Sequence, residues 1–415
     1  MGEIFKGETM QWENQLTDWA TELRSQSAIP LRVDLWNGRQ LHFCEDEPEV
    51  IVRLPKMASL FCFLQASLSS LGTAYVEGMI EVDGSADAII SVANRLAASR
   101  HLQEGKLSRL SRHLFRNKTK EKEAIQYHYD VSNAFYQQWL DDDMSYSCAY
   151  FESGNEDLNL AQQKKIDHIL KKIRLQAGDQ LLDIGCGWGA LLIRAAQKYD
   201  VNCVGITLSE NQASLARERI ARAGLSNRID IRLQDYRDLE GSFNKITSIG
   251  MFEHVGIENL TSYFQKMHSL LAEGGIVMNH GITTTDYDNG ETPFGNGDFI
   301  EKYVFPYGQL PHLSTALRSM QMGGLEVYDI ENLRRHYART CMLWSRRFET
   351  NAKEIIALVG ERRYRIWRVY LAGCSYAFDQ DWISLYQIVA VKAGTNPQQL
   401  PWSRQYMYSN QNSLH

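Results

Sequence analysis

The stretch SIGMFEHVG at residues 248–256 places two groups that can move protons at the end of an apolar run. The run predicts a buried strand, and it stops at the carboxylate of Glu253 and the imidazole of His254. In α/β proteins the carboxyl ends of the strands face the ligand, so this position favours binding or acid–base chemistry. A helix cap or a solvated loop would explain the same residues without any chemistry. For His254 we favour such a structural role, as a cap of the following helix.

A second stretch, LLDIGCGWGALL, has the composition of a ligand-binding turn between a strand and a helix. Its glycines at positions 185, 187 and 189 let the backbone turn tightly and approach a ligand, and the helix amino terminus adds N–H donors. Asp183 stands on the strand before the turn, where a carboxylate suits the amino group of S-adenosylmethionine. A dinucleotide is the alternative, although it calls for an acidic residue about 20 residues later, where the sequence offers Thr207.

These stretches need a scaffold that brings strand ends together, and the pattern around them supplies one. Strand-like runs alternate with helical stretches in the order QLLDIG, 189–199, NCVGIT, 209–224, IDIRLQD, KITSIGMF, 258–272 and GGIVMNHGIT, and QIVAVKAG adds a late strand. This alternation predicts an α/β fold with a doubly wound, mostly parallel sheet and helices on both faces.

The part of the chain before this alternation has a different pattern. Residues 1–98 contain short alternating runs such as LRVDLWNG and predict a smaller α+β domain. Residues 99–122 are rich in Lys and Arg, with leucines at near-helical spacing, and predict a basic linker. Residues 123–415 form the predicted catalytic domain.

Composition narrows the classes of function. The net charge of −6 argues against a surface built for nucleic acid. The seven cysteines are scattered and form no CxxC pair, so we expect neither disulfides nor a metal site. The amino terminus lacks the pattern of a signal peptide, and no apolar run reaches about 18 residues. We therefore expect a cytoplasmic protein that does not span a membrane.

A series of longer motifs resembles one family in the family's own order. The motifs are YHYDVSNAFY, MSYSCAYF, LLDIGCGWG, VGITLSENQ, LQDYRDL, MFEHVG, NHGIT, RRHYARTCMLW and LAGCSYAF. With them the chain resembles the cyclopropane-fatty-acyl-phospholipid synthases of the long, two-domain bacterial type, which are class I methyltransferases with a Rossmann-like fold. The amino-terminal YVEGMIEVDG resembles the extra domain of the long members.

The resemblance implies two neighbouring ligand sites. The residues around S-adenosylmethionine would be Tyr146, Ser147, Asp183, Gly185, Gly187, Gly189, Thr207, Leu208, Gln212, Gln234, Asp235 and Tyr236. The residues around a bicarbonate ion beside the donor methyl would be Glu253, His280, Tyr337 and the backbone of Cys148 and Ile282. Cys374 corresponds to the cysteine that the family labels as its active residue. QDYRDL lacks the tryptophan that some relatives carry there, which leaves the adenine contacts open.

The implied reaction explains this choice of residues. An alkene is a weak nucleophile, so it needs the electrophilic methyl group in line at about 3–3.5 Å, in a dry pocket. Methyl transfer leaves a carbocation, and loss of a proton to a weak base closes the ring. A carboxylate would repel bicarbonate, so either Glu253 accepts the ion's hydrogen or its own pKa is raised. A nucleophilic Cys374 would need an electropositive site, and we expect it to line the acyl channel instead.

The resemblance also implies a setting for the reaction. The substrate would be a membrane phospholipid, reached from the inner face of the membrane. The composition of the basic segment 99–122 suits binding to that anionic surface, and a solvated helical linker is the alternative. The amino-terminal domain would serve homodimer formation and lipid positioning. Two other functions are open: a fatty-acyl C-methyltransferase that forms a methyl or methylene branch, and a catalytically silent lipid-binding protein.

Overall fold

A computed structural model describes residues 14, 16–25, 28–64, 67–99, 131–287, 296–304 and 309–408. The predicted basic linker lies outside these residues except for Ser99. Contacts divide the chain into two compact units. One unit consists of Met1–Phe115, Glu291–Pro306 and Trp344–Tyr376, and the other of Arg116–Gly290, Tyr307–Leu343 and Ala377–His415. Unlike the predicted domains, these units are not continuous in the chain.

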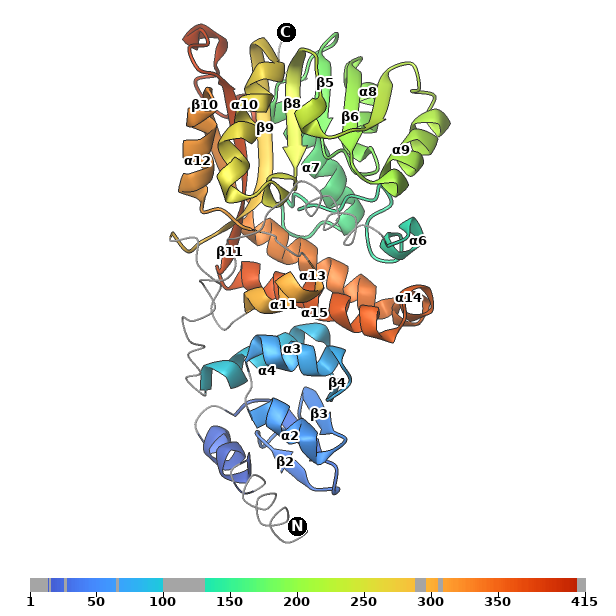
Figure 1. Ribbon diagram of the computed structural model, residues 1–415, viewed down its shortest axis with the longest axis vertical. Helices are drawn as coiled ribbons and strands as arrows, with labels where there is room; N and C mark the ends of the chain where they lie inside the picture. The colour runs from blue at the N-terminus through green and yellow to red at the C-terminus, as the bar shows by residue number, and fades with distance from the viewer. Residues whose placement is uncertain are drawn as a thin grey trace. The chain divides into compact units, whose positions relative to one another are not determined.

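The larger unit is built on a seven-stranded sheet (Figure 1). Across the sheet the strands are β10 (Leu325–Asn332), β11 (Ile383–Lys392), β9 (Leu271–Thr284), β8 (Phe243–Ile249), β5 (Gln180–Ile184), β6 (Asn202–Thr207) and β7 (Ile229–Leu233). The strands from β9 to β7 are parallel, and β11 and β10 are antiparallel to their neighbours. The mostly parallel sheet is confirmed, and β10 is an addition to the predicted strands.

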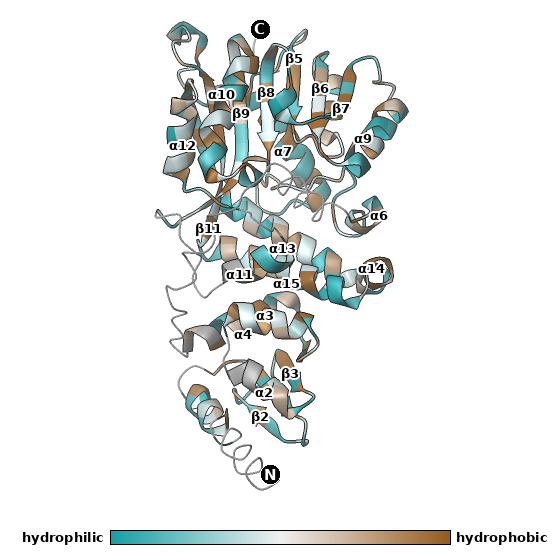
Figure 2. Cartoon of the chain, in the orientation of Figure 1, coloured by the Kyte–Doolittle hydropathy of each residue, from teal (hydrophilic) through white to brown (hydrophobic). Residues whose placement is uncertain are grey.

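Helices cover both faces of this sheet, as the alternation predicts. One apolar layer packs α7 (Leu158–Lys172), α8 (Ala190–Tyr199) and α9 (Glu210–Arg222) against the strands, and a second layer packs α10 (Leu260–Leu270) and α12 (Leu313–Met322). Neighbouring strand residues alternate between the layers, so that Leu181 belongs to the first and Leu182 to the second. Figure 2 shows that polar and apolar residues are mixed along α9, α10 and α12.

The smaller unit has its own sheet and core, which confirms an amino-terminal α+β region. Its strands lie in the order β2 (Gln40–His42), β1 (Leu31–Leu35), β3 (Val50–Leu54) and β4 (Glu81–Asp83). Its helices are α2 (Met57–Leu64), α3 (Leu68–Val76), α4 (Ala86–Ser99), α11 (Asn296–Tyr303), α14 (Ala352–Val359) and most of α15 (Glu361–Asp379). A shared apolar cluster joins Val76, Phe299 and Ile366, so the later segments pack with α3.

The remaining elements complete the larger unit. They are α6 (Asn133–Tyr136), α16 (Gln405–Tyr408), the first part of α13 (Arg334–Thr350), and the short turns η2 (Tyr236–Asp238), η3 (Phe252–His254), η4 (Ile257–Asn259) and η6 (Pro397–Gln399). In the described part of the chain, every helix is too short or too polar to cross a bilayer.

Candidate functional site

The loop between β5 and α8 is shaped by its glycines. Gly185, Gly187 and Gly189 have φ angles of 83°, 53° and 82°, a region in which other residues are strained. The N–H groups of Gly185 and Cys186 both donate to the carbonyl of Ile206 at 3.0 Å, which ties the loop to the next strand. At Gly187 the space that a side chain would fill is open. This space belongs to a pocket at the carboxyl ends of β5 and β6.

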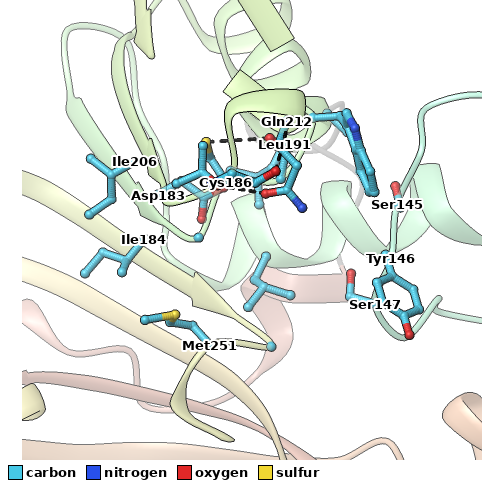
Figure 3. A pocket seen from close by; sticks show the side chains of 18 of the residues that line it. Ser145, Tyr146, Ser147, Asp183, Ile184, Cys186, Leu191, Ile206, Gln212 and Met251 are labelled. Atoms are coloured by element: carbon cyan, nitrogen blue, oxygen red, sulfur yellow. Dashed lines mark hydrogen bonds between the residues drawn. The ribbon is translucent and has the colours of Figure 1, made fainter. Parts of the chain in front are cut away.

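Most of the residues predicted to surround the methyl donor line this pocket. They are Tyr146, Ser147, Asp183, Gly185, Gly187, Thr207, Leu208, Gln212, Gln234 and Tyr236. Figure 3 shows Tyr146 and Ser147 across the pocket from Asp183.

Two predicted donor residues, Gly189 and Asp235, are not among the residues that line the pocket. Gly189 precedes the first turn of α8 and packs near Ala216. Asp235 caps η2 and accepts hydrogen bonds from the Arg237 guanidinium at 2.7 and 2.9 Å. Both residues shape the loops around the pocket, and their contact with a ligand stays a prediction.

Polar groups at the strand ends are held in fixed pairs. The hydroxyl of Thr247 donates to Asp183 Oδ1 at 2.7 Å, and burial raises the pKa of Asp183 to about 6. The hydroxyl of Thr207 donates to Gln212 Oε1 at 2.7 Å. An ammonium group bound next to Asp183 would favour its ionised form, because an opposite charge lowers a carboxyl pKa.

Aromatic side chains hold the loop that carries Tyr146. The ring of Tyr146 packs against Tyr136 and Trp139, with centroids 5.7 and 5.4 Å apart. Tyr136 in turn packs against Trp188 of the glycine loop at 5.1 Å, and the Trp188 indole N–H donates to Asn133 at 2.8 Å. The motif YHYDVSNAFY thus ends in residues that position the two sides of the pocket.

Glu253 lies in η3, and this turn begins directly after Met251, which lines the pocket. The N–H of Ile282 donates to Glu253 Oε1 at 2.7 Å, whereas Oε2 is buried without a partner. Burial raises the pKa of Glu253 to about 7, in agreement with the second of the two alternatives predicted for it. Because Glu253 already uses the N–H of Ile282, an ion bound through that N–H would have to displace the carboxylate.

His280 lies on β9, beside the pocket wall. Its carbonyl accepts a hydrogen bond from Gly250 at 2.8 Å, and Gly250 lines the pocket. The side-chain amide of Gln387 donates to His280 Nδ1 at 3.1 Å, so the remaining ring proton is on Nε2. Nε2 is buried without a partner, and burial lowers the pKa of His280 well below its usual range. The ring is therefore a neutral donor.

Cys148 and Tyr337 are both hydrogen-bonded to the backbone of Leu333, which is linked to the strand that carries Ile282. The carbonyl of Leu333 accepts from the Tyr337 N–H at 3.0 Å and from the Cys148 thiol at 3.9 Å. The N–H of Leu333 donates to Leu385 at 2.8 Å, and Leu385 is paired with Ile282 across β11 and β9. Direct contact of the Tyr337 hydroxyl or the Cys148 backbone with an ion stays a prediction.

Cys374 lies on α15, in the segment that belongs to the smaller unit. Burial raises the pKa of its thiol to about 12. A protonated thiol is a poor nucleophile, in agreement with the expectation that Cys374 does not attack the substrate. Its predicted place along an acyl channel stays a prediction.

Two residues that line the pocket were not assigned to a ligand site from the sequence. His254 lines the pocket, and burial lowers its pKa to about 4. The capping role expected for it stays a prediction, and the N-cap positions of η4 and α10 are occupied by Gly256 and Asn259. The position of His254 at a strand end was the available signal. Lys165 also lines the pocket, and nothing in its helical surroundings distinguishes it from a solvated lysine.

Comparisons with known proteins agree with this geometry. A family model described as mycolic acid cyclopropane synthetase matches residues 116–388, and a model described as a domain of unknown function matches residues 19–105. A probable fatty acid methyltransferase of Pseudomonas putida is 47% identical over 383 residues, which cover 92% of this chain and 96% of the relative. Cyclopropane mycolic acid synthase 1 of Mycobacterium tuberculosis is 37% identical over 276 residues, which cover 65% and 96%.

Solved structures show the same fold over about two thirds of the chain. The cyclopropane synthase MmaA2 of Mycobacterium tuberculosis has a TM-score of 0.63 at 35% identity and covers 65% of this chain and 98% of its own. The mycolic acid cyclopropane synthase CmaA1, complexed with SAH and CTAB, has a TM-score of 0.62 at 36% identity and covers 65% and 97%. The chain therefore belongs to the mycolic acid cyclopropane synthetase family of S-adenosylmethionine-dependent methyltransferases.

Proposed function

We propose that this protein transfers a one-carbon unit from S-adenosylmethionine to the cis double bond of unsaturated acyl chains in membrane phospholipids and closes a cyclopropane ring. One observation carries the proposal: two buried polar atoms, Glu253 Oε2 and His280 Nε2, have no partner among the described residues. Both residues adjoin the donor pocket without lining it, Glu253 between the lining residues Met251 and His254, and His280 through the bond from Gly250 to its carbonyl. Buried polar atoms are nearly always satisfied, so such a pair suggests a small polar ligand.

The pocket fits the donor in shape and charge. The open space at Gly187 lets a ligand approach the backbone, and Asp183 offers a buried carboxylate to an amino group. When bound, S-adenosylmethionine supplies an electrophilic methyl group. The chain's own task is to orient that methyl and to keep water away from the cation that methylation leaves on the acyl chain.

The second site fits bicarbonate. With a pKa of about 7, Glu253 can keep a proton on its carboxyl group near neutrality, and neutral His280 offers an N–H. Two uncharged donors bind an anion without repelling it. Bicarbonate held there would supply a weak general base. The family resemblance adds Tyr337 and the backbone of Cys148 and Ile282 to the proposed site, and the Ile282 N–H would reach the ion only after it leaves Glu253 Oε1.

Two cysteines have thiols that stay protonated, and a protonated thiol resists alkylation by the methyl donor. Burial raises the pKa of Cys148 far above its usual range, and the pKa of Cys374 to about 12. Thiolates are nucleophiles, and a thiolate near a methyl donor would be alkylated. The proposed site thus combines a weak base with a thiol at Cys148 that stays protonated.

A second candidate is a fatty-acyl C-methyltransferase, which forms a methyl or methylene branch. This candidate is favoured by the name of the Pseudomonas putida relative, which is a probable fatty acid methyltransferase. Both candidates share methyl transfer and differ in how the cation is resolved. Direct loss of a proton from the new methyl group closes the ring, whereas a 1,2-hydride shift before that loss gives a methylene branch, and loss of a proton from a chain carbon gives a methyl-branched alkene. The proposal also includes a homodimer and a peripheral position on the anionic inner face of the membrane, both implied by the family resemblance.

Product analysis separates the two candidates. The protein is incubated with vesicles of an unsaturated phosphatidylethanolamine and methyl-labelled donor, with and without bicarbonate, and the acyl chains are examined by proton NMR. We expect upfield ring hydrogens that depend on bicarbonate. Retained olefinic hydrogens with a labelled branch would establish the second candidate, and label-free lipid with intact donor binding would reject both. Glu253→Gln should abolish ring formation while it leaves binding of S-adenosylhomocysteine intact.

A further inference from the structure

The donor pocket contains a buried cation that the proposed reaction leaves without a role. Lys165 of α7 is 3% exposed and lines the pocket. Its ammonium donates to Ser147 Oγ at 2.8 Å, and this is its one hydrogen bond with the described residues. An ammonium group carries three N–H donors, so two donors remain for a ligand.

The helix face that carries Lys165 also fixes the pocket loop. The side-chain amide of Gln162, one turn earlier, donates to the carbonyls of Ser145 and Ser147 at 3.3 and 2.8 Å. Residues three apart share a helix face, so Gln162 and Lys165 hold the same loop segment. Lys165 therefore extends from the same face of α7 that holds the backbone of Ser145 and Ser147.

A buried cation of this kind calls for an anion. Burial lowers the pKa of Lys165, and the carboxylates of Asp141 and Asp183 oppose this effect from beyond ion-pair distance, so that no described carboxylate forms an ion pair with its ammonium. Unpaired buried charges are costly, and a charge kept in a binding pocket is normally neutralised by its ligand. Besides Lys165, Asp183 is the one charged side chain among the lining residues when His254 is neutral.

The donor matches this pair of charges. The methionine end of S-adenosylmethionine is a zwitterion, with an ammonium and a carboxylate on the same carbon. We propose that Lys165 binds the donor's carboxylate, so that Lys165 and Asp183 together recognise the zwitterion. The inference rests on donor binding in this pocket and does not depend on which lipid product is formed.

Two ligands of the unmodified protein test the recognition directly. Calorimetry compares S-adenosylhomocysteine with its decarboxylated analogue, S-adenosyl-3-thiopropylamine. A charge-assisted hydrogen bond to the missing carboxylate predicts that the analogue binds about 10- to 100-fold more weakly. Equal affinities would overturn the proposal.

Substitutions of two neighbouring lysines test whether Lys165 is the source of the preference for the carboxylate. Lys165→Met should lose most of the 10- to 100-fold preference for the carboxylate, with little change in the affinity for the analogue. Lys164→Met is the matched control, because Lys164 binds Glu152 and Glu156 outside the pocket. It should keep the full preference. Full preference in Lys165→Met would contradict the assignment.

A last arm separates the donor carboxylate from bicarbonate, which offers similar oxygens. If Lys165→Met keeps the donor preference but needs more bicarbonate for activity, the ammonium serves bicarbonate and the proposal is wrong. Because the binding arms use no lipid, a failure of ring formation leaves their result unchanged. If Lys165→Met does not fold, as judged by its melting curve, Lys165→Gln replaces it in the same comparison.

Discussion

Glu253 is a buried carboxyl group whose nearest polar contact is a backbone N–H and not a cation. Burial therefore dominates, and it raises the pKa to about 7 from the ordinary value of 4.5. A raised carboxyl pKa means that the folded protein binds the proton more tightly than the unfolded chain does. The stability that this provides is complete below about pH 4.5 and is lost as the pH rises through 7.

Glu253→Gln should therefore become more stable, relative to the unmodified protein, as the pH rises. The amide keeps an acceptor for the Ile282 N–H but cannot ionise. We expect similar unfolding free energies at pH 4.5 and a gain on the order of 2 kcal/mol at pH 8. Urea unfolding at both pH values measures this. Glu258→Gln, at an exposed position of η4, is the control and should show no such trend. A pH-independent difference for Glu253→Gln would contradict the raised pKa.

Gln387 controls the proton position on His280, because its amide donates to Nδ1. Gln387→Glu replaces that donor by an acceptor of nearly the same size, which moves the ring proton to Nδ1. We expect Nε2 to lose its role as a donor and kcat to fall by about 10- to 100-fold. Nitrogen chemical shifts of His280 report the tautomer directly. If Nε2 stays protonated in the variant, Gln387 does not set the tautomer.

Among elements, the approach of η3 to β9 depends on a glycine. A Cβ at Gly281 would lie 2.0 Å from the Phe252 ring, far inside van der Waals contact. This contact lets Glu253, the next residue, reach the N–H of Ile282. The predicted strand KITSIGMF ends earlier than expected, at Ile249, because the chain turns here to bring η3 against β9.

Gly281→Ala should thus cost both stability and activity. Overpacking of a close contact typically costs about 1–3 kcal/mol, and displacement of η3 moves Glu253 away from its partner. Denaturant unfolding measures the first effect and ring formation the second. Gly373→Ala on α15 is the control for stability, since its Cβ would meet open space. If Gly281→Ala were as stable as the control, the contact would not be restrictive.

Helices and strands could be predicted where one sequence pattern determines both which residues are buried and where the element ends. Strands such as β5 and β6 are continuous apolar runs followed by glycine or helix signals, and their ends located Asp183 and Thr207. The strand β10 was missed because its sequence, LEVYDIEN, mixes acids with apolar residues at a half-exposed sheet edge. Lys165 and Gln387 were missed because their partners, Ser147 and His280, are 18 and 107 residues away.

At the scale of the whole molecule, the smaller unit joins segments far apart in the chain. The Arg368 guanidinium donates to Glu349 at 2.7 Å, to the Gly84 carbonyl at 2.6 Å and to the Tyr75 hydroxyl at 3.0 Å. Glu349 also accepts from the Ala86 N–H at 3.1 Å. These bonds connect the amino-terminal strand and helices to α13 and α15, so we expect them to unfold together.

Arg368→Met tests this cooperativity. The side chains of Arg368 and Glu349 are only 12% and 24% exposed, so breaking their pair should cost about 3 kcal/mol. Arg346→Met is the matched control, because Arg346 is 63% exposed and lies 3.7 Å from Asp87, and we expect a cost below about 0.5 kcal/mol. Hydrogen exchange should accelerate in α4 and α15 of Arg368→Met alike, with β5 and β6 unchanged. Acceleration confined to α15 would mean that the amino-terminal region folds independently, as the continuous domains predicted from the sequence imply.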